Sequence, residues 1–199
     1  MQIIPLEHCW SLTGAPEDVA AEVLEFQRAL VRYFEEVKHQ GVVFLETVVG
    51  KAHKERYQTR IECVPMGFEE AADASIYFKK ALQEAGETWS THPKIIQTTA
   101  QRGLRRAVPD NFPYFHVEWA STMCPRGNGY VHVIEDESKF NRRSDFGFDV
   151  VLGLLGEDPR LFNRARKHGS RSSHNHKRQR EQVMAFVKGW GQYDFTQKL

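Results

Sequence analysis

Apolar residues recur at steps of three and four through the first forty positions of the chain. This spacing predicts one amphipathic helix, which Pro16 opens because the first helical residue needs no N–H donor, and which Gly41 ends. Acidic residues gather at its start, where they suit the helix dipole. The apolar stripe consists of Val19, Val23, Phe26, Leu30, Phe34 and Val37.

Runs of β-branched and aromatic residues predict strands on both sides of this helix. Ile3 and Ile4 indicate a short first strand, and residues 42–49 and 57–64 indicate an antiparallel pair after the helix. The second half of the chain predicts further elements in this order: a helix over 69–89, an apolar run at 95–96, strands over 113–120 and 129–136 joined by a loop over 121–128, and helices over 145–158 and 181–190.

This order of elements predicts an α+β fold made of two parts. We expect residues 1–66 to form the first part, with a strand, the long helix and antiparallel strands, and residues 67–199 to form a second small α+β subdomain packed on it. Residues 164–180 are rich in basic, histidine and serine residues and contain no acid and no apolar period. We therefore expect a mobile basic loop there.

Composition narrows the class of protein. The 199 residues are 41% hydrophobic, which is enough to build a core, and the formal net charge of +1 points to no particular partner. The three cysteines form no CxxC pair, which fits a reducing compartment. No apolar run approaches the roughly 20 residues that cross a bilayer. We therefore expect a soluble intracellular protein with no membrane partner.

The stretch "YQTRIECVP", from Tyr57 to Pro65, carries an unusual polar row. Gln58, Arg60 and Glu62 stand at alternate positions, and the period of a strand places alternate residues on one face. A guanidinium in such a row can bind phosphate through two parallel hydrogen bonds. The alternative is a solvated strand face on which Arg60 and Glu62 pair with neighbouring groups.

A strand, a long helix and a hairpin whose second strand ends in proline together resemble the C-terminal part of a histidine-triad nucleotide-binding domain. In that family, three histidines stand at the positions that Gln58, Arg60 and Glu62 occupy here, and the middle histidine attacks the α-phosphate. Arg60 cannot do this, because a guanidinium stays protonated and is no nucleophile. The resemblance therefore implies a degenerate, phosphate-facing site without catalytic residues.

A second resemblance extends over the chain from residue 2 to residue 199. The segments "IIPLEHC", "IYFKKALQEAGETWS", "NFPYFHVEW", "DFGFDVVLGLLGEDPRLF" and "YDFTQKL" are similar, in this order, to the two C-terminal domains of the CwfJ family of splicing factors. This resemblance implies a first domain that is histidine-triad-like and truncated at its N-terminus, since the family's leading strands and CxxC pair are missing. The chain is then expected to be a C-terminal fragment.

The same resemblance bears on metal binding. In zinc-bearing relatives of the triad fold, a CxxC pair, a histidine after an "IPLEH"-type strand and the first triad histidine hold one zinc ion. His8 matches the histidine of that strand, but Gln58 stands at the fourth position and is a poor zinc ligand. We expect no cofactor in this chain, with zinc possible in the full-length protein. The alternative to zinc binding is that His8 is a packing residue at a strand end.

Other candidate catalytic groups are His53, His116 and His132. His116 and Glu118 share one strand face, but a general base also needs a nucleophile and an orienting group within reach. The alternative is that these histidines are satisfied strand residues. Cys63 and Cys124 lack a histidine partner motif and are expected to be buried as small hydrophobic residues.

Clusters of basic residues indicate a possible RNA-binding surface. Cationic side chains that neutralise phosphates give a salt-dependent affinity for RNA. Aromatic neighbours such as Tyr114, Phe115 and Phe140 are candidates to stack on unpaired bases. The alternative is that the 27 basic residues pair with the 26 acidic ones. The candidate RNA-binding or partner-binding residues are Arg102, Arg105, Arg106, Lys139, Arg142, Arg143, Arg164, Arg166, Lys167, Lys177, Arg178 and Arg180.

The resemblance to the CwfJ family, taken with the loss of the triad histidines, implies a non-catalytic, nuclear component of the late, intron-lariat spliceosome that docks RNA and proteins in splicing and lariat turnover. The partners implied by the resemblance are spliceosomal proteins, intron-lariat or small nuclear RNA, and the lariat-debranching enzyme. Two other functions remain open. One is a histidine-triad-like nucleotide-binding phosphoesterase that uses His116 or His132, and the other is a scaffold that binds only proteins.

Overall fold

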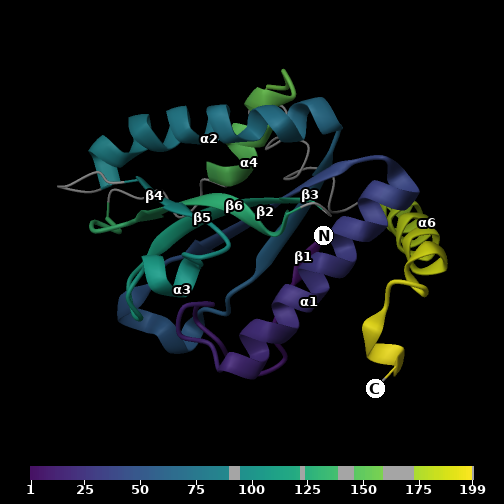
Figure 1. Cartoon of the computed structure of the whole chain (residues 1–199), viewed down its shortest axis with the longest axis horizontal. Helices are drawn as coiled ribbons and strands as arrows, with labels where there is room; N and C mark the ends of the chain where they lie inside the picture. The colour runs from purple at the N-terminus through teal and green to yellow at the C-terminus, as the bar shows by residue number, and fades with distance from the viewer. Residues whose placement is uncertain (90–94, 122–123, 139–145, 159–172, 199) are drawn as a thin grey trace.

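The computed structural model describes residues 1–89, 95–121, 124–138, 146–158 and 173–198. In this part of the chain, six antiparallel strands form one sheet with helices on both faces (Figure 1), so the predicted α+β class is confirmed. The strand order across the sheet is β1-β3-β2-β5-β6-β4. The strands are β1 (Gln2–Ile3), β2 (Gly41–Val48), β3 (Ile61–Met66), β4 (Ile95–Thr98), β5 (Tyr114–Ser121) and β6 (Cys124–Val133).

Helices α2 and α4 cover one face of the sheet, whereas α1 and α3 lie on the other face and α6 packs beside α1 (Figure 1). None of the described helices is long and apolar enough to pass through a membrane. The helices are α1 (Glu17–Tyr33), α2 (Phe68–Trp89), α3 (Leu104–Ala107), α4 (Phe146–Leu154) and α6 (Ser173–Trp190).

The long amphipathic helix was predicted correctly in its position, but it ends in a different way. A π-helical turn, Phe34–Lys38, follows α1, and His39 adopts a left-handed conformation with φ of 54°. Gly41 is instead the first residue of β2, and a Cβ atom there would lie 2.5 Å from the Cβ of Ala71. Glycine is therefore required where α2 crosses closely over β2, not where α1 stops.

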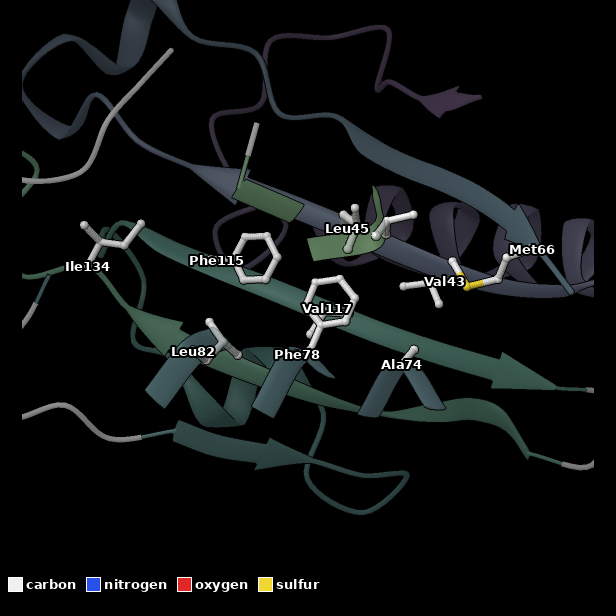
Figure 2. Packing of buried hydrophobic residues seen from close by; sticks show 10 residues of the cluster. Val43, Leu45, Met66, Ala74, Phe78, Leu82, Phe115, Val117 and Ile134 are labelled. Carbon is white, nitrogen blue, oxygen red and sulfur yellow. The ribbon is translucent and has the colours of Figure 1, made fainter. Parts of the chain in front are cut away.

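Strand alternation divides the apolar residues between two cores. On the α2 side, Phe78 projects from the helix toward Phe115 of β5, and their rings are stacked with centroids 6.1 Å apart (Figure 2). On the α1 side, Leu30 packs with Phe44 of β2 and Ile61 of β3. Both cores thus use β2 and its neighbours, which fixes the helices of both halves on one sheet.

Strand β2 joins the two predicted parts of the chain. On one side it pairs with β3, with Leu45 opposite Glu62, and on the other side it pairs with β5, with Leu45 opposite Val117. Residues before and after position 67 therefore contribute to a continuous sheet. The division into parts 1–66 and 67–199 remains a prediction, because a shared sheet does not by itself define where one unit ends.

Strand β3 begins later than the sequence suggests. It starts at Ile61, so Gln58 and Arg60 precede it. The residues just before it contact the N-terminal segment: the Thr59 N–H donates to the carbonyl of Cys9, with N···O at 2.7 Å. A second difference lies between β5 and β6. Ser121 pairs with Cys124, so most of the expected loop at 121–128 is strand.

Helix α6 begins at Ser173, eight residues before the expected start at 181, so residues 173–180 are helical rather than part of a loop. Lysine, arginine and glutamine have high helix propensity, and they let a helix extend without an apolar face. Its C-terminal half packs on α1, where Phe186 and Trp190 lie 5.0 and 6.1 Å from the Tyr33 ring. The rest of the predicted mobile loop, 164–172, lies outside the described residues.

We expect Phe78→Ala to lower the free energy of unfolding by about 3–5 kcal/mol, because it leaves a cavity between α2 and the sheet. The Phe78 side chain is fully buried, whereas Ile76 on the same helix is 67% exposed. Ile76→Ala is therefore the matched control and should change stability by less than about 1 kcal/mol. Urea unfolding of both variants measures the difference, and equal losses would contradict the packing described above.

Candidate functional site

The amide of Gln58 fastens the N-terminal segment to the body of the protein. Its Oε1 accepts from the Cys9 N–H at 2.9 Å, and its Nε2 donates to the carbonyls of Pro5 and Glu7, each at 3.0 Å. All three of these hydrogen bonds join the Gln58 side chain to backbone groups. The first position of the triad-like row thus serves the fold.

Arg60 and Glu62, the other two residues of the row, pair with each other. The Arg60 Nε lies 3.4 Å from Glu62 Oε1, and Gln2 Nε2 donates to the same oxygen at 3.2 Å. The Arg60 side chain is 55% exposed, so it does not point into the core. The alternative interpretation predicted that both residues pair with neighbouring groups, and here they pair with each other. Phosphate binding by Arg60 remains a prediction.

His8 lies beside the backbone of the turn before β3. Its Nε2 is 3.1 Å from the carbonyls of both Lys54 and Tyr57, which suits an N–H that donates to them. A nitrogen that donates in this way has no lone pair for a metal ion. Among the described residues, no group of three or more histidine, cysteine or acidic side chains is placed to hold a metal. Zinc ligation by His8 remains a prediction.

The other candidate histidines and cysteines lie in different places in the structure. His53 is exposed, with its Nδ1 3.9 Å from Glu55 Oε1, whereas His132 is 1% exposed in the sheet. Cys9 and Cys63 are free and buried, and burial raises the pKa of the Cys63 thiol to about 12, so it is unreactive. The prediction for Cys63 is confirmed. The side chain of Cys124 lies outside the described part of the chain.

A cavity of about 810 Å³ lies on the α1 face of the sheet, between α1 and α3. We call it the α1–α3 cavity. It brings together His116 and Glu118, which the sequence placed on one strand face, and Arg105 and Arg106, which the sequence assigned to a separate basic cluster. Its chemically relevant lining consists of Glu46, His116 and Glu118 from the sheet, Gln27 from α1, and Arg105 and Arg106 from α3.

Glu46 is the buried acid of this lining, and its hydrogen bonds are satisfied. Its Oε1 accepts from Thr59 Oγ1 at 2.6 Å and from the Leu12 N–H at 3.0 Å, and its Oε2 accepts from the Tyr114 hydroxyl at 2.8 Å. Burial raises the pKa of Glu46, and these donors oppose the rise. Glu46 was not among the predicted site residues, although an acid inside the apolar run "VVFLETVV" is a signal that the sequence contains.

His116 and Glu118, by contrast, lack good partners. Burial lowers the pKa of His116 to about 4, so its ring is neutral at pH 7. Among the described residues, the hydrogen-bond partner of its Nε2 is Thr98 Oγ1, at a long 3.5 Å. Burial raises the pKa of Glu118 to about 7. Its carboxyl forms no hydrogen bond or ion pair with the residues that the structure describes. Poorly satisfied titratable groups in a cavity are typical of functional sites.

Gln27 is a third polar group of this kind. It is 9% exposed and lines the cavity from α1, and its side-chain amide has no hydrogen-bond partner in the described segments. No pattern in the sequence singles out Gln27, because one glutamine on a long helix is ordinarily solvated. Only the approach of α1 to the sheet places it beside the strand residues.

The predicted basic residues occupy different parts of the structure. Arg102, Arg105 and Arg106 are exposed near α3, where Arg106 Nη1 donates to the carbonyl of Gln101 at 3.3 Å. A second exposed group on α6 consists of Lys177, Arg178 and Arg180. The other predicted basic residues lie outside the described part of the chain: Lys139, Arg142, Arg143, Arg164, Arg166 and Lys167.

Stacking of bases on Tyr114 or Phe115 was a wrong prediction. Both side chains are fully buried, Tyr114 beside Glu46 and Phe115 in the core under α2. Aromatic residues in a strand between two helical layers serve packing, and neither ring has a free face for a base. Phe140, the third aromatic candidate, lies outside the described residues.

Two family descriptions match the chain in succession. Residues 1–79 match the family described as "Protein similar to CwfJ C-terminal", and residues 88–196 match the one described as "Protein similar to CwfJ C-terminus 2". The first match includes Gln27 and Glu46, and the second includes His116, Glu118 and the α3 arginines. The α1–α3 cavity is therefore built from both matched segments.

Curated relatives match over nearly the whole chain. The human "CWF19-like protein 2" is 36% identical over 98% of this chain, and the Drosophila melanogaster "CWF19-like protein 2 homolog" is 30% identical over 96%. "Pre-mRNA-splicing factor cwf19" of Schizosaccharomyces pombe is 30% identical over 81%. The matches cover 20%, 25% and 25% of those proteins, so this chain spans about a fifth to a quarter of their length.

We expect Gln58→Ala to lower stability more than Arg60→Ala does. Gln58→Ala removes three hydrogen bonds to backbone groups, a loss of about 1–2 kcal/mol. Arg60→Ala removes one exposed ion pair and should cost less than about 1 kcal/mol. Urea unfolding of the two variants gives the comparison. A larger loss for Arg60→Ala would mean that the polar row has a different structural role.

We expect Glu118→Gln to stabilise the protein above pH 7. Because folding raises the pKa of Glu118 from 4.5 to about 7, the folded state keeps a proton that the unfolded chain has released between these values. The free energy of unfolding therefore falls as pH rises through this window. Removing the group should give a gain of about 1–3 kcal/mol at alkaline pH, which fades toward about pH 4.5.

Urea unfolding at several pH values measures this difference. The matched control is Glu84→Gln, at an exposed position on α2, which should leave stability nearly unchanged throughout. If Glu118→Gln were destabilising at every pH, the carboxyl would have a partner that the geometry above does not contain.

Proposed function

Because the chain belongs to the CwfJ C-terminal family, which matches residues 1–79 and 88–196, we propose that it is a docking module for RNA and proteins in pre-mRNA splicing. In this proposal the chain acts in the nucleus, within the late, intron-lariat spliceosome, and catalyses no reaction there. Its partners are spliceosomal proteins, intron-lariat or small nuclear RNA, and the lariat-debranching enzyme.

The names of the relatives support the splicing role. The Schizosaccharomyces pombe protein is named a pre-mRNA-splicing factor, and the animal relatives carry names derived from it. Since this chain spans about a fifth of the human protein, the activity of a whole relative is not carried over to it. The proposal concerns the contribution of these two matched segments.

The observation that carries the non-catalytic part of the proposal is the use of the triad-like positions for the fold. Gln58 holds the N-terminal segment, and Arg60 and Glu62 form an ion pair. A phosphoryl transfer that follows the histidine-triad route needs an uncharged imidazole at the middle position as nucleophile. An arginine there can hold a phosphate but cannot form the covalent intermediate.

Helix α6 supports the docking part. Lys177, Arg178 and Arg180 are exposed near its start, and the apolar side chains of Met184 and Val187 are 61% and 55% exposed farther along. Cationic side chains suit phosphate groups, and exposed apolar side chains suit a protein surface. One helix thus offers both kinds of contact beside the body of the protein.

We expect the chain to bind single-stranded RNA with an affinity that falls as salt rises. Replacing Lys177, Arg178 and Arg180 by alanine should weaken binding and reduce the slope of log affinity against log salt by about 2, because each lost phosphate contact removes about 0.7. The matched control, Lys79→Ala with Lys80→Ala, changes two exposed lysines of α2. Filter binding over a salt series is the measurement, and a flat response would favour a scaffold that binds only proteins.

We also expect the tagged chain, expressed in cells, to co-purify with excised intron lariats rather than with unspliced pre-mRNA. Primer extension across the branch point measures this enrichment. The purified chain should not hydrolyse adenosine-linked phosphoramidates or dinucleotides. Turnover that survives repurification and disappears in Arg60→Ala or in a His116 variant would establish the phosphoesterase alternative, and enrichment of pre-mRNA alone would refute the late stage.

A further inference from the structure

The α1–α3 cavity has the dimensions and the arrangement of a small-molecule site. Its volume of about 810 Å³ lies within the range of about 300–1,000 Å³ that such sites occupy. Its walls include Leu24 of α1, Ile61 of β3 and Leu104 of α3. Its polar lining includes buried groups of the sheet and of α1 and exposed arginines of α3, so the two ends of a ligand would meet different surroundings.

The inner end consists of groups that the fold leaves without adequate partners. Gln27 and His116 are 9% and 6% exposed, and Glu118 is half-buried beside them in the cavity. The polar atoms of Gln27 and Glu118 are open to the cavity rather than sealed in the core, so a ligand could reach them. The neighbouring Glu46 accepts three hydrogen bonds, so the fold is able to satisfy a buried acid when the role of that acid is structural.

The mouth is cationic. Arg105 and Arg106 are exposed at the edge of the cavity, on the single turn of α3. Glu17 at the start of α1 also lines the cavity, but two guanidinium groups outnumber its carboxylate. A ligand that enters would thus meet cations at the solvent end and neutral or acidic hydrogen-bonding groups inside.

We propose that the α1–α3 cavity binds a nucleotide, with the base against Gln27, His116 and Glu118 and the phosphate against Arg105 and Arg106. A base edge carries donors and acceptors side by side. The Gln27 amide offers both, a neutral imidazole offers one of each, and the Glu118 carboxyl accepts from ring or exocyclic N–H groups. The apolar walls contact the flat faces of the base.

Other anionic ligands fit less well. Inorganic phosphate would fill a small part of the volume and leave the inner polar groups unmatched. A phosphorylated side chain would place its anion at the arginines but would bring a flexible backbone, rather than a planar ring with a polar edge, toward Glu118. The nucleotide satisfies both ends at once.

This site is separate from the triad-like row. Ile61 lines the cavity and stands opposite Glu46, which also lines it. Successive side chains of a strand point to opposite faces, so Glu62 lies on the other side of the sheet. The nucleotide site therefore does not depend on the histidine-triad resemblance, and it does not depend on the splicing role proposed above.

A free nucleotide and an unpaired nucleotide of RNA present the same chemistry to this cavity. The experiment therefore titrates the purified chain with the four nucleoside monophosphates, with inorganic phosphate, and with a single-stranded RNA octamer of mixed sequence, by isothermal calorimetry. We expect at least one monophosphate, or the octamer, to bind tenfold or more tightly than inorganic phosphate. If a monophosphate binds, a free nucleotide is sufficient to occupy the cavity. If only the octamer binds, the ligand of the cavity is a nucleotide within an RNA chain.

Variants locate the binding in the cavity. Glu118→Gln and Gln27→Leu should each weaken binding at least fivefold, and Arg105→Ala with Arg106→Ala should weaken it at least tenfold. Lys79→Ala with Lys80→Ala removes two exposed cations from α2, on the opposite face of the sheet (Figure 1), and should bind as the native chain does. The α3 arginines are exposed, so the double variant remains a valid test even if a buried change prevents folding.

The proposal is overturned if none of the ligands binds more tightly than inorganic phosphate, or if the double arginine variant and Glu118→Gln bind normally. This result is distinguishable from failure of the splicing role. Loss of lariat co-purification with intact nucleotide binding refutes only the docking function, and intact co-purification without nucleotide binding refutes only the site proposed here.

Discussion

The pairing of β2 with a strand on each side is the constraint on which the rest of the structure depends. Its ladder with β3 and its ladder with β5 commit alternate residues to opposite cores. Val43 and Leu45 go to the core under α2, whereas Val42 and Phe44 go to the core under α1. Because strand periodicity allows no other distribution, Glu46 must lie on the α1 side. The same register places His116, opposite Glu46, beside it.

Much of this fold follows from local patterns in the sequence. The helix beginning near Pro16, the strand after Gly41 and the helix under which Phe78 packs were predicted within a few residues, because their periods are carried by the apolar residues themselves. One error lies at the start of β3, where the sequence shows no sign of the N-terminal segment that packs there. The strand begins at Ile61, and the Thr59 N–H donates to the carbonyl of Cys9.

The candidate site was predictable only in pieces. The shared strand face of His116 and Glu118 follows from spacing, and the basic character of Arg105 and Arg106 follows from composition. Their convergence does not follow, because it needs the turn between β4 and α3 to fold back over the same face of the sheet that α1 covers. Gln27 had no sequence signal at all. Conversely, the row at Gln58, Arg60 and Glu62 resembles a site in the sequence. In the structure, Gln58 and Glu62 form hydrogen bonds with the N-terminal segment.

The attachment of α6 has a mechanical consequence. The helix is held at its C-terminal end, by the rings of Phe186 and Trp190 around Tyr33 and by the Tyr193 hydroxyl, which donates to Glu36 at 2.7 Å. These contacts surround Tyr33, the last residue of α1, and the first turns of α1 form a wall of the cavity. One helix thus carries both the attachment of α6 and a wall of the candidate site, so a change in the angle of α1 would alter both.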